Sequence, residues 1–482
     1  MDRSIDRKTF LKISGAAGVA GAGILGGCSP ASNRGGASGA SRENPFPVTH
    51  EQSFNMRGYA APPIEEVGVA VIGVGNRGSG TVRRLASIEG VQVRAISDME
   101  EDRVNAAIES ISATHSPDGY FGGEEEWKKV CERDDIHLVA IATPWEWHVP
   151  MALHAMESGK HAYTELPAAQ TVEDCWRLVE TSERTRMHCV QMSASCHSGI
   201  SAVVLNMARQ GVFGELIHAE GAYIHDLMRD YNFTKTMYHD LWRLKENIGR
   251  HGSLYPQHGL VPILQIMDMN CGDQLDYLVS MSSNDFMMNE YARELASEDP
   301  FWEPYVDRDY RGNMNTTTIR TKKGRTIVVQ HDVTSPRPGV RFDLLSGTNG
   351  VYQARPPRFA HGHDGWVPDE EFQEMVQSYT PEITKRFREL SESSTTERPT
   401  HSYARVSPTD WRLIDSLRMG LPMDMDVYDA ALSSSVIPLS EWSVANRSTS
   451  VDVPDFTMGA WESNPRGMDI NLEQGGGETG LV

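Results

Sequence analysis

The sequence predicts an α/β protein with two folded parts: an N-terminal doubly wound parallel sheet and a C-terminal α+β domain with an open, mostly antiparallel sheet. The 482 residues exceed the usual size of one hydrophobic core, so two domains are expected. Short apolar strands alternate with helical segments up to about residue 195. Beyond residue 198 the alternation ends, and TTTIRTKKGRTIVVQHDV predicts a hairpin that turns at Lys323–Gly324.

The N-terminal domain is predicted to cover residues 64–195. Its first strand is VGVAVIG (67–73), an apolar run typical of a strand buried on both faces, and the residues after Gly78 have helical spacing. Four further strands are predicted in VQVRAIS, IHLVAIATP, HAYTE and HCVQM, with helices between them at 103–112, 150–158 and 172–186. This alternation indicates a parallel sheet covered by helices.

The rest of the chain divides by composition. Residues 196–462 predict the α+β domain, with a helix near 202–209 and a strand in LIHAEGAYIHDL. Residues 29–63 are rich in Ser, Gly, Asn and Pro and have no hydrophobic period, which predicts a flexible tether. Residues 463–482 predict a Gly-rich tail.

The first 28 residues predict an export signal rather than part of the fold. Arg3, Arg7, Lys8 and Lys12 form a basic start, followed by a Gly/Ala-rich apolar run too short to span a membrane. RKTFLK resembles a twin-arginine signal with Lys8 in place of the second arginine, and LGGC resembles a lipobox that ends on Cys28. We therefore expect an exported lipoprotein, anchored through Cys28 on the periplasmic or cell-surface side of a membrane.

Net charge and the spacing of cysteines and histidines argue against a nucleic-acid partner, disulfides and a bound metal. A formal net charge of −21 argues against binding to a nucleic-acid backbone. The five cysteines after Cys28 have no CxxC spacing, which predicts buried structural thiols rather than disulfides or a zinc site. The sequence His361-Gly362-His363-Asp364 has no third placed ligand, so no metal is expected.

A glycine-rich loop follows the first strand and predicts a dinucleotide site. Gly73-Val74-Gly75-Asn76-Arg77-Gly78 fits GxGxxG, where backbone N–H groups and a helix N-terminus can receive a pyrophosphate. Asp98 ends the second strand, where its carboxylate can accept hydrogen bonds from ribose hydroxyls and would repel a 2′-phosphate. NAD is therefore the expected cofactor.

A histidine lies in LYPQHGLVP (254–262), a segment without helical or strand period. A histidine in such a loop can be a satisfied structural residue, a metal ligand or a proton carrier. The segment alone leaves these interpretations of His258 open.

Two strings near the end of the N-terminal domain resemble a known architecture. TPWEWH (143–148) and YTELPAAQTVEDCW (163–176) are similar to the Gfo/Idh/MocA oxidoreductases, in which a Glu-Lys-Pro motif lies on the fifth strand. Here Leu166 replaces the lysine. Leucine cannot take a proton from a substrate hydroxyl as the lysine of the family's dehydrogenases does.

The resemblance becomes narrower along the rest of the chain, from about residue 64 to 460. The chain resembles the NAD-dependent glycoside hydrolase family 109, whose founding activity is α-N-acetylgalactosaminidase. The strings that carry this resemblance are the Glu-apolar-Pro-Ala-Ala segment, GAYIHDL, WRLKEN, LYPQHGLVP, GDQLDYLVSMSS, HDVTSPRP and DVYDAALSSSVIPLSEWSVANR.

The resemblance implies a glycosidase reaction that uses NAD⁺ without net consumption: oxidation at C3 of the sugar, deprotonation at C2, elimination of the aglycone, addition of water and re-reduction. Such enzymes are exceptions to the two-carboxylate rule. The family's catalytic and substrate-binding positions match His258 and Tyr223, and further substrate contacts match Arg243 and Tyr255. Its cofactor contacts match Asn76, Arg77, Asp98, Trp145, His148, Glu165 and Leu166.

Two departures from the family bear on specificity. Ser193-Ala194 stands where the family has Glu-Asn near the nicotinamide, and Gly339 stands where it has a substrate-contacting tyrosine. Two alternatives therefore remain beside the glycosidase: a net sugar or polyol dehydrogenase, which Leu166 argues against, and a sugar-binding lipoprotein with a vestigial cofactor site. The resemblance also implies a carbohydrate partner and assembly into homo-oligomers.

Overall fold

The N-terminal half of the computed structural model is built on a parallel sheet of six strands. The structure describes residues 44–48, 50–193, 196–197, 199–393 and 406–482. The strands run in the order β3-β2-β1-β4-β5-β6, which is the predicted doubly wound arrangement. Their bounds are β1 (Val67–Ile72), β2 (Val91–Ser97), β3 (Asp118–Tyr120), β4 (Leu138–Ile141), β5 (His161–Thr164) and β6 (Cys189–Gln191).

Helices connect these strands, and every residue of β1 and β4 is buried, as expected for strands covered on both faces. The helices are α2 (Gly78–Ala86), α3 (Glu101–Glu109), α4 (Glu126–Cys131), α5 (His148–Glu157) and α6 (Val172–Thr185), with a short 3₁₀ turn, η1 (Trp145–Trp147), before α5. Thr171 caps the start of α6, and its side chain accepts a hydrogen bond from the backbone N–H of Asp174.

The C-terminal half contains an eight-stranded sheet in the order β13-β12-β11-β7-β10-β9-β8-β14. Only the central pair β7 and β10 is parallel, so the predicted open, mostly antiparallel sheet is confirmed. The strands are β7 (Leu216–Ile224), β8 (Leu275–Ser282), β9 (Asn315–Thr321), β10 (Thr326–Asp332), β11 (Val340–Gly347), β12 (Gly350–Ala354), β13 (Pro357–His361) and β14 (Val451–Asp452).

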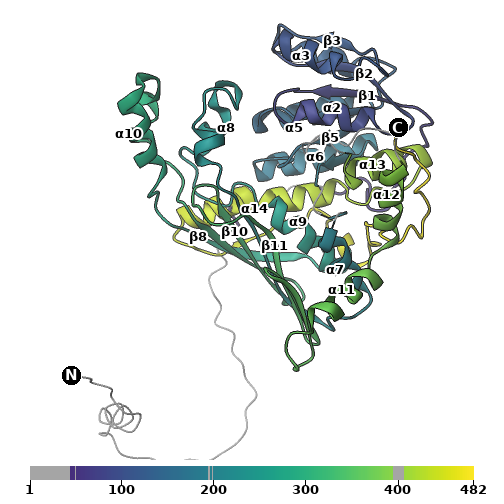
Figure 1. Ribbon diagram of the computed structural model, residues 1–482, viewed down its shortest axis with the longest axis vertical. Coiled ribbons are helices and arrows are strands. Elements are labelled where there is room, and N and C mark those ends of the chain that lie inside the picture. The colour runs from purple at the N-terminus through teal and green to yellow at the C-terminus, as the bar shows by residue number, and fades with distance from the viewer. Residues whose placement is uncertain (1–43, 49, 194–195, 198, 394–405) are drawn as a thin grey trace, which may run out of the picture. The chain divides into compact units, whose positions relative to one another are not determined.

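Helices α9 and α14 pack on this sheet, α9 against β7 and β11 and α14 against β8 (Figure 1). Helix α14 also packs against α6 and β6, so it joins the two sheets within one compact unit, Asn44–Val482. The remaining helices and turns are α7 (Gly199–Arg209), η2 (Met228–Asn232), η3 (His239–Leu241), α8 (Trp242–Lys245), α9 (Gln257–Ile266), α10 (Met288–Glu298), η4 (Pro300–Tyr305), α11 (Asp369–Ser378), α12 (Glu382–Ser393), α13 (Pro408–Met419), α14 (Val427–Ala445) and η6 (Ala460–Glu462).

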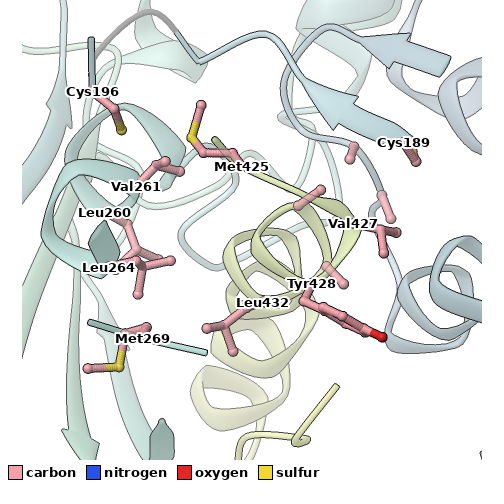
Figure 2. Close-up of a cluster of buried hydrophobic side chains, with 14 of the residues drawn as sticks. Cys189, Cys196, Leu260, Val261, Leu264, Met269, Met425, Val427, Tyr428 and Leu432 are labelled. Atoms are coloured by element: carbon pink, nitrogen blue, oxygen red, sulfur yellow. The ribbon is translucent and has the colours of Figure 1, made fainter. Parts of the chain in front are cut away.

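The segment around His258 differs from its prediction, because His258 lies in the first turn of α9 rather than in a loop. Pro262 lies inside this helix and has no N–H to donate to the carbonyl of His258. Apolar packing compensates: Figure 2 shows Leu260 and Leu264 of α9 directed toward α14, which carries Leu432. The buried interface between the two helices thus holds α9 in place.

The structure also differs from the predicted tether. Residues Met56 and Arg57 are buried, and the Arg57 guanidinium forms ion pairs with Asp426 at 3.1 Å and Asp429 at 2.9 Å. The buried carboxylates at the start of α14 require a compensating charge, and the segment before the first strand supplies it. Residues 50–63 are therefore part of the fold, whereas Cys28, the predicted signal (1–28) and Ala194 lie outside the described residues.

The predicted Gly-rich tail is likewise packed. The indole N–H of Trp411 in α13 donates to the backbone carbonyl of Thr479 at 2.8 Å, and Ile470 is buried. Gly475, Gly476 and Gly477 have positive φ angles, a backbone conformation that residues with a side chain rarely adopt. The tail thus closes over α13.

The described part of the chain holds four buried cysteines and one, Cys271, that is half-buried. Burial raises the pKa of Cys131 and Cys189 to about 12, which makes both thiols unreactive near neutral pH. Within the described residues, no helix combines the length and the apolar character that crossing a membrane requires.

Candidate active site

A cavity of about 1230 Å³ lies between the carboxyl ends of the parallel strands and the end of β7. Ligands of open α/β sheets bind at this edge because the strand ends and helix N-termini meet there. The cavity brings together every predicted site residue of the described chain except Gly78. These residues are Gly73, Gly75, Asn76, Arg77, Asp98, Trp145, His148, Glu165, Leu166, Tyr223, Arg243, Tyr255 and His258.

The glycine loop after β1 depends on the absence of side chains. A Cβ on Gly78 would lie 1.7 Å from the carbonyl oxygen of Gly73, and one on Gly73 would lie 2.8 Å from a methyl carbon of Thr143. The first turn of α2 has no side-chain cap from its N-cap residue, Arg77. Its backbone N–H groups are thus suited to an anion such as a pyrophosphate.

Two acidic side chains, Asp98 and Glu165, contact residues of this loop. Asp98 follows β2, and its carboxylate accepts hydrogen bonds from the backbone N–H of Val74 at 2.8 Å and of Glu100 at 3.1 Å. Farther into the cavity, Arg77 Nε donates to Glu165 Oε1 at 3.1 Å. The loop, the uncapped helix and Asp98 together fit NAD.

Two predicted cofactor-contacting residues also stabilise the floor of the cavity. His148 is fully buried, with Nδ1 2.7 Å from the carbonyl oxygen of Pro167 and Nε2 3.0 Å from that of Thr143. It connects the ends of β4 and β5. Leu166 is buried in the same hydrophobic cluster as Trp145 and Tyr255, so the position of the family lysine holds an apolar side chain that exchanges no proton.

Tyr223 and His258 form a stacked pair in the cavity. Their ring centroids are 5.1 Å apart with an interplanar angle of 16°. Tyr223 is near the end of β7 and His258 is in α9, and the backbones of these elements touch through two glycines. A Cβ on Gly221 would lie 2.6 Å from the Gly259 carbonyl oxygen, and one on Gly259 would lie 2.2 Å from the Ala222 nitrogen.

Burial and charge determine the protonation state of His258. Burial, followed by the positive charges of Arg341, Arg77 and Arg243, holds the pKa of His258 well below its usual value of 6.5. The imidazole is therefore neutral at physiological pH. A neutral imidazole next to a phenol is a group that can accept a proton from a bound molecule.

Arg243 is enclosed by aromatic rings. Its guanidinium carbon is 5.0 Å from the ring centroid of Tyr255 and 5.1 Å from that of Trp145, and these two rings are stacked on each other at 5.4 Å. Burial alone would lower the pKa of Arg243, but nearby phenols, led by Tyr238, raise it overall. Phenols rather than carboxylates lead the groups that raise the pKa of Arg243, and no ion pair of its guanidinium is found within the described residues, so its donors can serve a ligand.

Several residues of the cavity wall were missed from the sequence. They are His225, Tyr231, Tyr238, Trp242 and Arg341. His225 could have been found, because it lies two residues after Tyr223 and strand periodicity places such residues on one face. Arg341 could not, because it approaches the site only through the pairing of β11 with β7.

Two other sequence features lie outside the cavity wall. Gly339 precedes β11, and a Cβ there would lie 3.3 Å from the Ile224 carbonyl oxygen. Gly339 does not line the cavity, although its neighbour Arg341 does. His361 and His363 are exposed around the end of β13 and do not line it either.

A glycine loop on a doubly wound sheet, facing a second open sheet across one cavity, defines the class of proteins with an NAD-binding Rossmann fold. Residues 67–192 match the oxidoreductase family with an NAD-binding Rossmann fold. A crystal structure of levoglucosan dehydrogenase in complex with NADH shares this fold, with a TM-score of 0.58 at 16% identity, covering 81% of this chain and 100% of that one. An NAD-binding oxidoreductase from Klebsiella pneumoniae gives a TM-score of 0.61 at 15% identity, with the same coverage of each chain.

The match of the second half of the chain identifies the protein family. Residues 200–463 match the C-terminal domain of glycosyl hydrolase 109. An α-N-acetylgalactosaminidase of Bacteroides fragilis is 44% identical over 422 residues, 85% of this chain and 96% of that protein. An α-N-acetylgalactosaminidase of Shewanella oneidensis is 40% identical over 469 residues, 95% of this chain and 97% of that protein. The chain belongs to glycoside hydrolase family 109, which confirms the predicted resemblance, and it is a glycoside hydrolase with an NAD-binding domain.

Proposed function

We propose that this protein cleaves glycosides, with α-N-acetylgalactosaminides as the first substrates to test, by transient oxidation at C3, deprotonation at C2, elimination of the aglycone, addition of water and re-reduction. The observation that carries the proposal is the stacked Tyr223–His258 pair in the same cavity as the glycine loop. Relatives named α-N-acetylgalactosaminidase support the choice of sugar. The family's matched positions support the roles of Tyr223 and His258.

NAD⁺ is the proposed cofactor, and when bound it would take a hydride from C3 of the sugar and return it within the same turnover. The glycine loop, the first turn of α2 and Asp98 would hold it. Leu166 adds a buried apolar side chain to the cavity wall, which would help to exclude water from a bound ligand.

The residues of the protein account for binding and proton transfer. His258 is neutral, so it can accept a proton from a sugar hydroxyl or from C2, the carbon next to the transient ketone. The phenol of Tyr223, stacked on it, offers a second proton-carrying group. Arg243 offers several fixed donors to sugar hydroxyls or an acetamide carbonyl, and Tyr255 offers a ring face to the sugar.

A net dehydrogenase is the second candidate activity. It requires a proton acceptor at the family's lysine position, and Leu166 cannot serve there. A sugar-binding protein with a vestigial cofactor site is the third, and catalytic release of an aglycone separates it from the first.

The proposal is tested with the purified protein, beginning at residue 44, and a panel of α- and β-nitrophenyl glycosides in D₂O. We expect release of nitrophenol together with deuterium bound to C2 of the product, detected by NMR. His258→Gln should lower the rate by about 10²- to 10⁴-fold, the usual contribution of a positioned base. The matched control His251→Gln alters an exposed histidine that pairs with Asp309 and should leave the rate unchanged.

Absence of release from every glycoside, with NAD still bound, would contradict the glycosidase proposal and favour the binding protein. Accumulation of NADH with a free sugar would favour the dehydrogenase. Release without C2 deuterium would require a second experiment with a C3-deuterated substrate, because a shielded base can return the original proton.

We further propose that the protein is exported and anchored through lipid on Cys28. The basic start, the apolar run and LGGC support this, and the folded unit begins only at Asn44, after Cys28. Metabolic labelling with a palmitate analogue should mark the full chain and leave Cys28→Ala unlabelled. Labelling of both proteins, or of neither, would contradict the anchor.

A further inference from the structure

Arg341 is anchored at the end of the strand that carries Tyr223. It lies in β11, which pairs antiparallel with β7 and brings Val340 opposite Ile224. The Nη1 atom of Arg341 donates to the carbonyl oxygens of Ile224 and Val340, both at 3.0 Å. These bonds fix the guanidinium beside the last residues of β7.

The guanidinium lies against the catalytic candidates. Its carbon is 4.4 Å from the centroid of the Tyr223 ring, within cation–π distance, and Tyr223 is stacked on His258. Arg341 is half-buried and lines the same cavity as both residues. The Arg341 guanidinium therefore contacts the Tyr223 ring, and His258 stacks on that same ring.

We propose that Arg341 is a positioning residue of the reaction, which holds the Tyr223 ring against His258 and supplies positive charge beside the point where the sugar loses its proton. This role rests on the proposed function. When the C2–H bond breaks, the proton passes to the base and the electron pair moves onto the oxygen at C3. A fixed guanidinium nearby favours that negative charge.

The charges around His258 support the same role. Arg77 faces it from the start of α2, Arg243 from α8, His225 from the end of β7 and Arg341 from β11. Burial lowers the pKa of His258 most, and among the charges Arg341 has the largest effect. Tyr223 and Tyr255 contribute neutral rings at 5.1 and 5.0 Å. Arg341 thus contributes to keeping the imidazole ready to accept a proton.

The test follows the protonation of His258 without any substrate. The protein is labelled with ¹³C-histidine, the His258 resonance is assigned by its loss in His258→Gln, and its pH titration is compared between the wild type, Arg341→Met and Arg341→Lys. Methionine keeps an apolar chain of similar reach, so burial is retained while the charge is lost. We expect the pKa of His258 to rise by about one unit or more in Arg341→Met, the usual effect of one close charge, and to rise less in Arg341→Lys.

Arg358→Met is the matched control, since the Arg358 guanidinium lies 3.9 Å over the Trp366 ring outside the cavity. It should not change the His258 titration. An unchanged titration in Arg341→Met, or equal changes in Arg341→Met and Arg341→Lys, would overturn the assignment of positive charge to Arg341. Thermal unfolding and NAD binding of each variant show that the fold is retained.

The same variants are then assayed for aglycone release. We expect kcat of Arg341→Met to fall at least tenfold at pH 7, with partial rescue by Arg341→Lys and a smaller change in KM. A change in KM alone would overturn the positioning role. If the wild type releases no aglycone, the proposed function fails, whereas the histidine titration still decides whether Arg341 controls His258.

Discussion

At the scale of single residues, the cavity combines the neutral imidazole of His258 with an arginine, Arg243, that is enclosed by aromatic rings rather than paired with a carboxylate. Arg243 is the clearest case, because its guanidinium lies about 5 Å from the rings of both Trp145 and Tyr255. Cation–π contacts orient a guanidinium without occupying its N–H donors in the way a carboxylate would. Arg243 can therefore bind a ligand without first breaking an ion pair.

We predict that Arg243→Met raises KM for the glycoside by about 10- to 100-fold, because hydrogen bonds from a charged group contribute about 1.5–3 kcal/mol. Initial-rate kinetics over a range of substrate concentrations measure this change. The control is Arg229→Met, which removes a guanidinium 4.3 Å over the Tyr291 ring outside the cavity. Equal KM values for wild type and Arg243→Met would place the sugar elsewhere in the cavity.

At the scale of elements, the position of His258 depends on direct contact between α9 and β7. The two backbones meet at Gly221 and Gly259, where no Cβ fits. On its other side α9 packs on α14 through Leu260 and Leu264 (Figure 2). The helix is thus fixed from both sides, and with it the stacking of His258 on Tyr223.

We predict that Gly259→Ala separates α9 from β7 and lowers both stability and activity, because the added Cβ would lie 2.2 Å from the Ala222 nitrogen. Overpacking of this kind costs about 1–3 kcal/mol. Urea unfolding measures the loss. Gly123→Ala is the stability control, since its Cβ would be 3.4 Å from the nearest side-chain atom, an ordinary contact. Equal stability of the two variants would contradict the close approach.

The same elements show how far the sequence predicted the fold and the site. The parallel sheet followed from local patterns, since β1 and β4 are continuous apolar runs and the glycine loop follows β1 directly. Helix α9 was not predicted, because it contains Pro262 and is buried on nearly all sides. Its sequence therefore lacks the alternation of apolar and polar residues that marks a surface helix. Arg341 was missed because its place depends on strand pairing across 117 residues of sequence, which no local pattern reports.

At the scale of the whole molecule, the segment before the first strand completes the core. Arg57 is 5% exposed and forms ion pairs with both Asp426 and Asp429 at the start of α14. Helix α14 packs against elements of both sheets, so a contact at its start affects the entire unit. Composition alone suggested a tether here because a single buried arginine has no compositional signal.

We predict that Arg57→Met lowers the free energy of unfolding by about 3–5 kcal/mol, because it leaves carboxylates buried without their partner. The matched control is Arg466→Met, which removes an exposed pair with Asp268, held by two 2.8 Å contacts, and should cost less than about 1 kcal/mol. Chemical denaturation of both variants provides the comparison. Similar losses in the two would show that burial does not decide the strength of these pairs.

Acid should already destabilise the protein between pH 6.5 and pH 4, because two of its buried histidines resist protonation in the folded state. Burial lowers the pKa of His161 to about 4 and that of the stacked His188 to about 3. Below pH 6.5 these histidines bind protons in the unfolded chain but stay neutral in the folded protein. Their contribution to the free energy of unfolding is therefore complete above pH 6.5 and is lost as the pH falls toward 4. Asp426 acts in the opposite direction, because burial raises its pKa to about 6 and the folded form protonates first.

The effect of the histidines on stability should exceed that of Asp426, because burial lowers the pKa of His148, His258 and His331 as well. His161 and His188, whose pKa values lie well below 5.5, should each remove on the order of 1 kcal/mol between pH 7.5 and 5.5, because the unfolded chain binds the proton over this range. Urea unfolding at both values tests this. His188→Phe should weaken the pH dependence, whereas the exposed His251→Phe should not; the same slope in all three proteins would contradict the assignment.

The central claim, that this glycosidase works through NAD held in the cavity, is tested most directly by removing the cofactor. Aglycone release is measured on protein stripped of NAD, then after NAD is added back, with absorbance at 340 nm recorded throughout. We predict no release by the stripped protein, recovery of the rate with added NAD⁺, and no net formation of NADH over many turnovers. Release at the full rate by the cofactor-free protein would contradict the claim.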